Sequence, residues 1–80
     1  MPTVLREAGF DFRIYTDDHP PAHVHVLKAG EEAVIDLGSE IMRPRVRDNF
    51  GMNRKNLRSA FLIVNERQKF LLQEWRRLHG

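Results

Sequence analysis

Three histidines within seven residues are the strongest candidates for chemistry in this chain. The run DDHPPAHVHV, residues 17–26, places His23 and His25 two positions apart. On a β-strand both side chains leave the same face, with Cα atoms about 6.5–7 Å apart. Two imidazoles so placed can bind one metal ion, or they can act as general base and general acid.

The metal hypothesis adds His19, which lies at the mouth of the same expected strand. Asp17, Asp18 and Asp36 are candidates for further ligands, or for side chains that orient the imidazoles. Because the chain has no cysteine, any metal must be held by nitrogen and oxygen ligands. The expected cofactor is therefore at most a divalent transition metal.

The metal-free alternative is cleavage of RNA by attack of its own 2′-hydroxyl, with His23 and His25 transferring the protons. Asp36 would orient one imidazole, and Arg13 on the neighbouring strand, or the row Arg43, Arg45 and Arg47, would hold the phosphate. Tyr15 on the same face would donate a proton or stack on a base. The structural alternative is that the histidines only hydrogen-bond on an open sheet face, with residues 18–21 closing a turn.

A second candidate surface is basic. Between residues 43 and 58 the chain carries six cations against one acid, Asp48, and the cations are Arg43, Arg45, Arg47, Arg54, Lys55 and Arg58. In an extended segment the first three form a row that suits a nucleic-acid backbone or an acidic partner. The last three lie near the start of an expected helix, where a bound anion would offset their unfavourable interaction with the helix dipole. A solvated charged loop is the structural alternative.

Four strands are expected to position the histidines, between about residues 3 and 37. Apolar residues alternate with polar ones at 10–15, 23–28 and 33–37, and turn residues stand at 8–9 and 29–30. A two-residue turn at 29–30 would place His23 opposite Asp36, and a longer turn would shift Asp36 towards His25. Either register puts a carboxylate beside a histidine.

The second half of the chain is expected to be helical. Residues 38–52 show no regular pattern and are predicted to be irregular. Asn53 is a suitable N-cap, and apolar residues then recur every three or four positions from about 54 to 78. One long amphipathic helix is predicted, or two with a bend near residues 65–68. The expected fold is α+β, a two-layer sandwich in which this helix covers one face of a four-stranded antiparallel meander, as a single domain of residues 1–80.

Composition is typical of a folded protein, with 41% apolar and 30% charged residues and a net charge of +2. No apolar run approaches membrane-spanning length, and the N-terminus lacks a signal-peptide pattern. We therefore expect a cytoplasmic protein that does not associate with a membrane. An open sheet face and open sheet edges would allow a homodimer.

The string of residues 18–26, together with Met1-Pro2-Thr3-Val4, Gly9-Phe10 and Tyr15, resembles the bacterial family called domain of unknown function 4160. Further matching features are Gly51, Leu57, Ile63-Val64, Leu71-Leu72 and Trp75. The resemblance implies a short cytoplasmic protein, often encoded beside another small protein and proposed as half of a toxin–antitoxin-like pair. It implies no catalytic residues. Asn53-Arg54-Lys55-Asn56 departs from the Ser/Thr cap and following acid of many relatives, so the basic surface is argued from this chain alone.

These observations predict a component of a toxin–antitoxin-like module that binds RNA and a cognate small protein encoded nearby, and that could be a histidine-dependent ribonuclease. One alternative is a non-catalytic metal-binding domain, in which His23 and His25 act with His19 or Asp36. The other is a pure interaction module whose interface is the polar face of the sheet.

Overall fold

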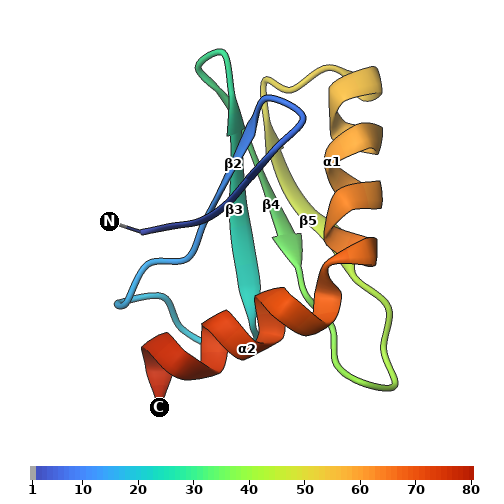
Figure 1. Cartoon of the computed structure of the whole chain (residues 1–80). Helices are drawn as coiled ribbons and strands as arrows, with labels where there is room; N and C mark the ends of the chain where they lie inside the picture. Colours follow the sequence, from blue (N-terminus) through green and yellow to red (C-terminus); the bar gives the residue numbers. More distant parts are fainter. Residues whose placement is uncertain (1) are drawn as a thin grey trace.

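Alternating apolar and polar side chains produce the strands of the first half of the chain, and helical apolar spacing produces the helices of the second. The computed structural model describes residues 2–80. The strands are β1 (Thr3–Glu7), β2 (Phe10–Arg13), β3 (His23–Lys28), β4 (Glu31–Asp36) and β5 (Arg45–Phe50), and the helices are α1 (Arg54–Glu66) and α2 (Gln68–His79) (Figure 1). The predicted α+β class is confirmed.

The strands form one antiparallel sheet in the order β1-β2-β3-β4-β5. Two-residue turns join β1 to β2 and β3 to β4, and the residues at both positions of each turn have positive φ angles, 53° and 82° in the first and 51° and 81° in the second. Such turns match the natural twist of a hairpin. The tight second turn fixes the expected register, with His23 opposite Asp36 and Val24 opposite Ile35.

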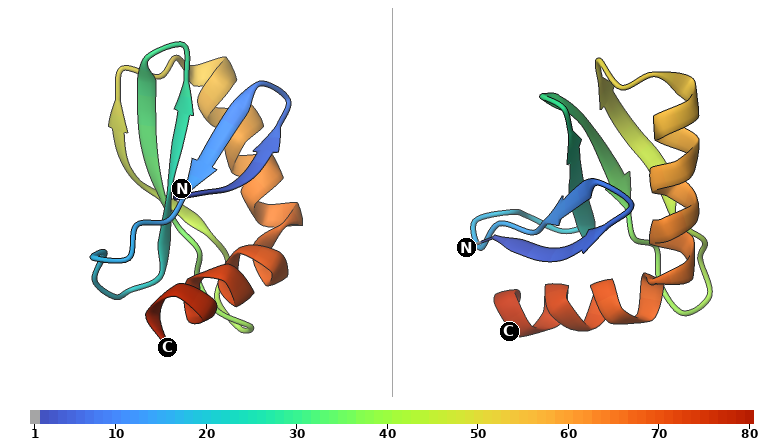
Figure 2. Two further views of the ribbon diagram at one scale, coloured as in Figure 1. Left: turned by 60° about the vertical axis from the view of Figure 1, so that its left-hand side comes forward. Right: turned by 45° about the horizontal axis from the view of Figure 1, so that its top comes forward.

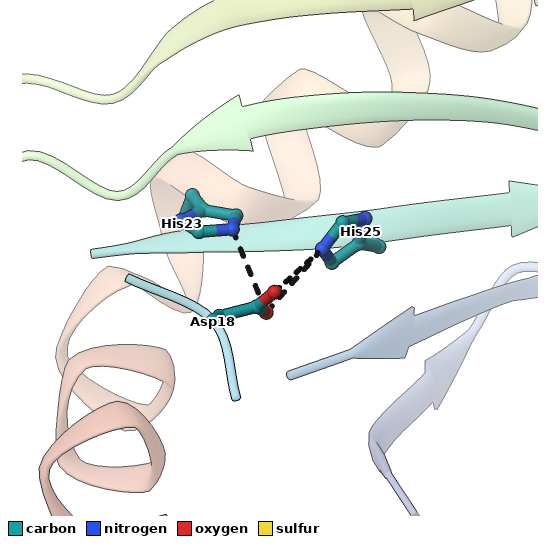
Figure 3. Close-up of side chains that lie close together, drawn as sticks. All are labelled: Asp18, His23 and His25. Atoms are coloured by element: carbon teal, nitrogen blue, oxygen red, sulfur yellow. Dashed lines mark hydrogen bonds and ion pairs between the residues drawn. The ribbon is translucent and has the colours of Figure 1, made fainter. Parts of the chain in front are cut away.

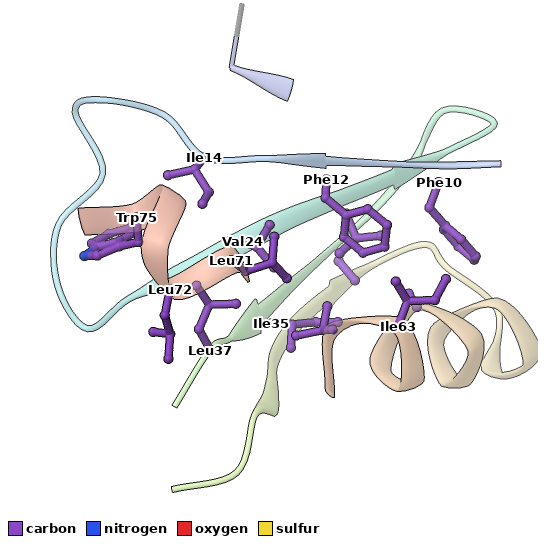
Figure 4. Packing of buried hydrophobic residues seen from close by; sticks show 14 of the residues in the cluster. Phe10, Phe12, Ile14, Val24, Ile35, Leu37, Ile63, Leu71, Leu72 and Trp75 are labelled. Carbon is purple, nitrogen blue, oxygen red and sulfur yellow. The ribbon is translucent and has the colours of Figure 1, made fainter. Parts of the chain in front are cut away.

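The core lies between one face of the sheet and the two helices (Figure 4). Figure 2 shows α1 running alongside this helix-covered face while α2 crosses the end of the sheet. Burying a large apolar side chain contributes about 1.5–3 kcal/mol, and the largest fully buried ones are Phe10, Phe12, Ile14, Ile35, Leu37, Leu71, Val24, Val26 and Val64. The opposite side of the sheet, which carries Arg13, His25, Glu32 and Asp36, is called the open face below.

The prediction of four strands is wrong, because β5 lies inside the segment predicted to be irregular. Strand β5 pairs with β4, with Ala33 opposite Asn49 and Asp36 opposite Arg45. All six of its residues are exposed, so it lacks the apolar alternation that marks a half-buried strand. Backbone pairing with β4, rather than burial of its side chains, forms this strand.

The single long helix is also wrong, and the alternative of two helices with a bend near residues 65–68 is confirmed. Arg67 lies between α1 and α2 with φ −99° and ψ 16°, and its N–H still donates to the carbonyl of Ile63. The change of direction lets α2 bury Leu71, Leu72 and Trp75 under the end of the sheet. No helix within residues 2–80 is long and apolar enough to cross a bilayer.

Candidate metal centre

One carboxylate and two imidazoles converge at the end of β3. His23 and His25 stand on β3, and Asp18 stands in the turn that connects β2 to β3 (Figure 3). One ligand atom from each of these three residues can be chosen so that all three atoms lie within 4.8 Å of one another. The sequence places the two histidines on one side of the strand and offers Asp18 as one of three candidate carboxylates.

The connecting turn aims Asp18 at β3. The backbone N–H of Asp18 donates to the carbonyl of Tyr15 at 3.1 Å, and the N–H of Tyr15 donates to Asp18 Oδ2 at 3.0 Å. Asp18 thus closes the turn from Tyr15 through both its backbone N–H and its carboxylate. This pair of bonds fixes the carboxylate before any contact with the histidines is considered.

The separations between Asp18 and the imidazoles are too long for strong charged hydrogen bonds. The distance from Asp18 Oδ2 is 3.5 Å to His23 Nε2 and 3.3 Å to His25 Nε2, whereas charge-assisted N–H···O bonds are about 2.7–2.9 Å long. Tetrahedral ligands about 2.1 Å from a metal are about 3.4 Å from each other. The observed spacing therefore resembles that of two ligands on one metal ion.

Each imidazole has a hydrogen-bond partner at Nδ1, on the side of the ring away from Asp18. That partner determines which ring nitrogen carries the proton and which has a lone pair. His23 Nδ1 lies 2.9 Å from the carbonyl oxygen of Pro21, which can only accept, so Nδ1 carries the proton. His25 Nδ1 lies 3.0 Å from Glu32 Oε2, which is likewise an acceptor. In the neutral rings both Nε2 atoms then present lone pairs to the Asp18 carboxylate. Three electron-pair donors facing one another need either added protons or a cation between them.

Aromatic rings hold both imidazoles in place. The ring centroid of Trp75, on α2, lies 5.3 Å from that of His23, and the ring of Tyr15 meets His25 edge-on at 4.8 Å. The side chains of His23, Asp18 and His25 are 7%, 15% and 17% exposed. The site is thus mostly buried, yet still reached by solvent. Such packing preorganises ligands in the way that a metal site requires.

A family model described as a domain of unknown function (DUF4160) matches residues 9–76. The chain belongs to the DUF4160 family. The matched range contains the three converging residues and Trp75. The comparisons with curated proteins and with solved structures gave no match.

In this DUF4160 chain, two of the predicted site residues, Asp36 and Arg47, pair with each other and do not belong to the converging group. The carboxylate of Asp36 lies 2.6 Å from the guanidinium of Arg47, although its Cα is opposite that of His23. Arg47 also donates to the carbonyl of Pro21 at 3.3 Å. The Asp36–Arg47 pair therefore ties β4 and β5 to the Pro21 turn. The β4 carboxylate that contacts an imidazole is Glu32, which lies beside Nδ1 of His25 on the side of the ring away from Asp18.

His19 and Asp17 are exposed, and neither belongs to the converging group of the described residues. Arg13 lies across the ladder from His25, where its guanidinium pairs with Asp11 at 3.4 Å. Hydrogen bonding to the Tyr15 side chain, reinforced by Asp11, raises the pKa of Arg13 above its ordinary range. The structure thus places a permanent cation on the open face beside the candidate site.

The basic residues lie on another part of the DUF4160 fold, along β5 and the first turns of α1. They are separated from β3 by β4. Within residues 2–80, five of the six make no salt bridge, and these are Arg43, Arg45, Arg54, Lys55 and Arg58. The structure does not bring them together with the histidines.

Sequence reasoning missed the contributions of Glu32 and Trp75. Glu32 shares the open face with Asp36 by the two-residue period of a strand, so extending the predicted strand 33–37 back by one residue would have found it. The contact of Trp75 with His23 depends on the angle between the helices, which the helical apolar spacing does not specify.

Proposed function

We propose that this protein is a divalent transition-metal-binding domain whose ligands are Asp18 Oδ2, His23 Nε2 and His25 Nε2. The observation that carries the proposal is that Asp18 Oδ2 lies 3.5 Å from His23 Nε2 and 3.3 Å from His25 Nε2, in a group that offers three ligand atoms within 4.8 Å of one another. One divalent cation at their centre would offset the mutual repulsion of all three groups. Two histidines and one carboxylate form a set that suits Zn²⁺, Fe²⁺, Co²⁺ or Ni²⁺ better than Mg²⁺ or Ca²⁺.

The surroundings of the three side chains support the same function. Metal-bound histidines usually donate their other N–H to a carbonyl or a carboxylate, which fixes the ring and raises its basicity. His23 meets this condition through Pro21, and His25 meets it through Glu32. Three protein ligands also leave a coordination position free for water or a small ligand. The proposal is therefore an open site rather than a closed structural one.

The test is metal analysis of protein that is expressed and purified without a histidine tag, followed by titration with Zn²⁺ and Co²⁺. One bound ion per chain is expected, with visible Co²⁺ bands of a nitrogen- and oxygen-ligated ion. Asp18→Asn and His25→Ala are each expected to weaken metal binding by about 100-fold or more. Even mutating a residue that only hydrogen-bonds to a metal ligand typically lowers metal affinity about 10–100-fold.

His19→Ala is the matched control, because this histidine is exposed and outside the cluster. It should leave affinity unchanged. The proposal fails if the protein binds no stoichiometric Zn²⁺ or Co²⁺, or if His19→Ala weakens binding as much as His25→Ala does.

The ribonuclease function predicted from the sequence would use the same histidines. A metal-free mechanism needs two imidazoles facing a phosphate, whereas here the Asp18 carboxylate faces both Nε2 atoms and would repel that anion. The geometry therefore favours the metal proposal. Cleavage of purified RNA in the presence of a chelator, lost in His25→Ala, would replace it with the ribonuclease of a toxin–antitoxin-like module.

A further inference from the structure

Strand β5 ends the sheet and presents an unpaired backbone edge. It is last in the strand order, and all six of its residues, Arg45–Phe50, are exposed. The left-hand view of Figure 2 shows it at the outer side of the sheet, with no described element beyond it. Such an edge is a template for pairing with another strand.

We propose that β5 docks an extended acidic segment of a partner protein, which adds to the sheet as a sixth strand. Main-chain hydrogen bonds to the β5 edge would supply affinity, and side chains along the edge would supply selectivity. The outer edge of β5 faces away from the metal site, because β4 lies between β5 and β3, although Arg47 on β5 reaches the Pro21 carbonyl beside His23.

Charge identifies the partner. Arg43 and Arg45 lie at one end of β5, and Arg54 and Lys55 follow its other end on the first turn of α1. Within the described chain none of these four makes a salt bridge, and the first turn of α1 has no acidic residue. Unpaired cations at both ends of an open strand are complementary to an acidic strand lying along it.

Exposed apolar side chains accompany these cations. Val46 and Phe50 on β5 are 37% and 60% exposed, and Ile41 and Met42 in the preceding loop are 94% and 59% exposed. Val46 lies opposite Ile35, on the helix-covered face. Alternating acidic and apolar residues in the partner would therefore match what the β5 edge offers.

The opposite edge of the sheet lacks these properties. Both edge ladders have an irregular register, β1–β2 between Thr3 and Leu5 and β4–β5 between Val34 and Ile35, but the charged side chains of β1 are already paired. Arg6 pairs with Asp11 at 3.2 Å, and Glu7 pairs with Arg67 at 3.0 Å. Of the two sheet edges, the β5 edge is therefore the one flanked by unpaired cations.

A second copy of the chain fits this edge poorly in parallel pairing, because Arg43 and Arg45 would then lie beside their own copies. Charged residues on an edge strand oppose such self-pairing, and the same repulsion selects an acidic partner. RNA would satisfy the cations but not the backbone N–H and C=O groups of the edge. The combination of free edge, apolar side chains and cations therefore favours a protein strand over RNA.

The experiment is selection of peptides from a random displayed library of dodecamers on the full-length protein, followed by titration calorimetry of a selected peptide. Selected sequences are expected to alternate Asp or Glu with Val, Ile or Tyr. Bound peptide is expected to slow amide hydrogen exchange within Arg45–Phe50. The double variant Arg43→Glu/Arg45→Glu is expected to bind about tenfold more weakly or worse.

Lys69→Glu, an exposed cation on α2, is the matched control and should bind normally. Asp18→Asn should also bind normally, which separates this result from that of the metal proposal. The inference is overturned if the selected peptides show no acidic bias or protect other strands. It is also overturned if no peptide binds, while a twelve-nucleotide oligouridylate binds the parent protein and loses that binding in the double variant.

Discussion

The side-chain amide nitrogen of Gln68 lies 2.9 Å from the carbonyl oxygen of Met42. The same nitrogen lies 2.8 Å from the carbonyl oxygen of Leu37 and 2.9 Å from that of Ser39. A primary amide has two protons, so three carbonyls compete for them. Gln68 is the first residue of α2, and this contact fixes the helix to the loop between β4 and β5.

Replacing Gln68 by Ala is expected to destabilise the protein by about 1–3 kcal/mol, because partly buried carbonyls lose their donor. Urea unfolding followed by circular dichroism measures the change. Gln73→Ala, at an exposed position of the same helix, is the control and should cost little. Equal stability of the two variants would show that the Gln68 contact is energetically unimportant.

The same loop depends on Gly38. Its φ is +71°, and a Cβ there would collide with the carbonyl oxygen of Met42 and lie 2.8 Å from that of Arg43. Gly30 has a φ of +81° and open space around it, so Gly30→Ala isolates the backbone strain of about 1–2 kcal/mol. Gly38→Ala is expected to lower the thermal midpoint more than Gly30→Ala does. A smaller loss at Gly38 would contradict the crowding seen at this turn.

The Glu32→Ala variant tests whether the contact between Glu32 and Nδ1 of His25 strengthens metal binding. Removing its carboxylate by Glu32→Ala frees the far side of His25, and the affinity for Zn²⁺ is expected to fall about 10–100-fold. Glu31→Ala changes the neighbouring position of β4, which lies opposite Lys28 rather than near the histidines. Competition with a colorimetric chelator measures both affinities. Equal affinities in the two variants would remove Glu32 from the site.

Glu74 gives the protein a pH-dependent contribution to stability. Arg77, one turn later on α2, donates to both carboxylate oxygens at 2.8 and 3.2 Å, and this hydrogen bonding lowers the pKa of Glu74 below its ordinary 4.5. A depressed folded-state pKa stabilises the protein above the ordinary value, and that contribution is lost as the pH falls through the lowered one. Because Arg77 is 61% exposed, the effect is expected to be small and sensitive to salt.

Glu74→Gln should therefore lower the thermal midpoint slightly at pH 7, and the difference from the parent should disappear in strong acid. Scanning calorimetry between neutral and acidic pH at low salt makes the comparison. Glu66→Gln, at an exposed position on α1, serves as the reference. A difference that grew towards acid would mean that the pair does not act through the ionised carboxylate.

The sequence was sufficient for the part of the sheet that carries the histidines. Ala29-Gly30 permits a two-residue turn with positive φ at both positions, and that turn alone sets His23 opposite Asp36. The alternation of Val24 and Val26 with the histidines then decides which side each side chain takes. Local patterns and one turn type were enough because these constraints act over only a few residues.

One unrecognised strand and one local turn decided what the sequence left open. Asp36 was a plausible partner for an imidazole until β5 brought Arg47 beside it, and β5 itself has no apolar alternation to reveal it. Asp18, Asp17 and Asp36 were equal candidates as ligands, and only the closed Tyr15–Asp18 turn distinguishes the first. The first outcome depends on a strand that the apolar pattern does not reveal, and the second depends on hydrogen bonds within a local turn that residue types alone do not specify.

The chain has one tryptophan and one tyrosine, and each touches a different histidine of the candidate site, Trp75 against His23 and Tyr15 against His25. All of the protein's strong ultraviolet emission therefore originates within van der Waals range of the two imidazoles. A paramagnetic ion such as Co²⁺ or Cu²⁺ bound there would quench that light. The native protein thus contains its own optical reporter of what occupies the site, with no label attached.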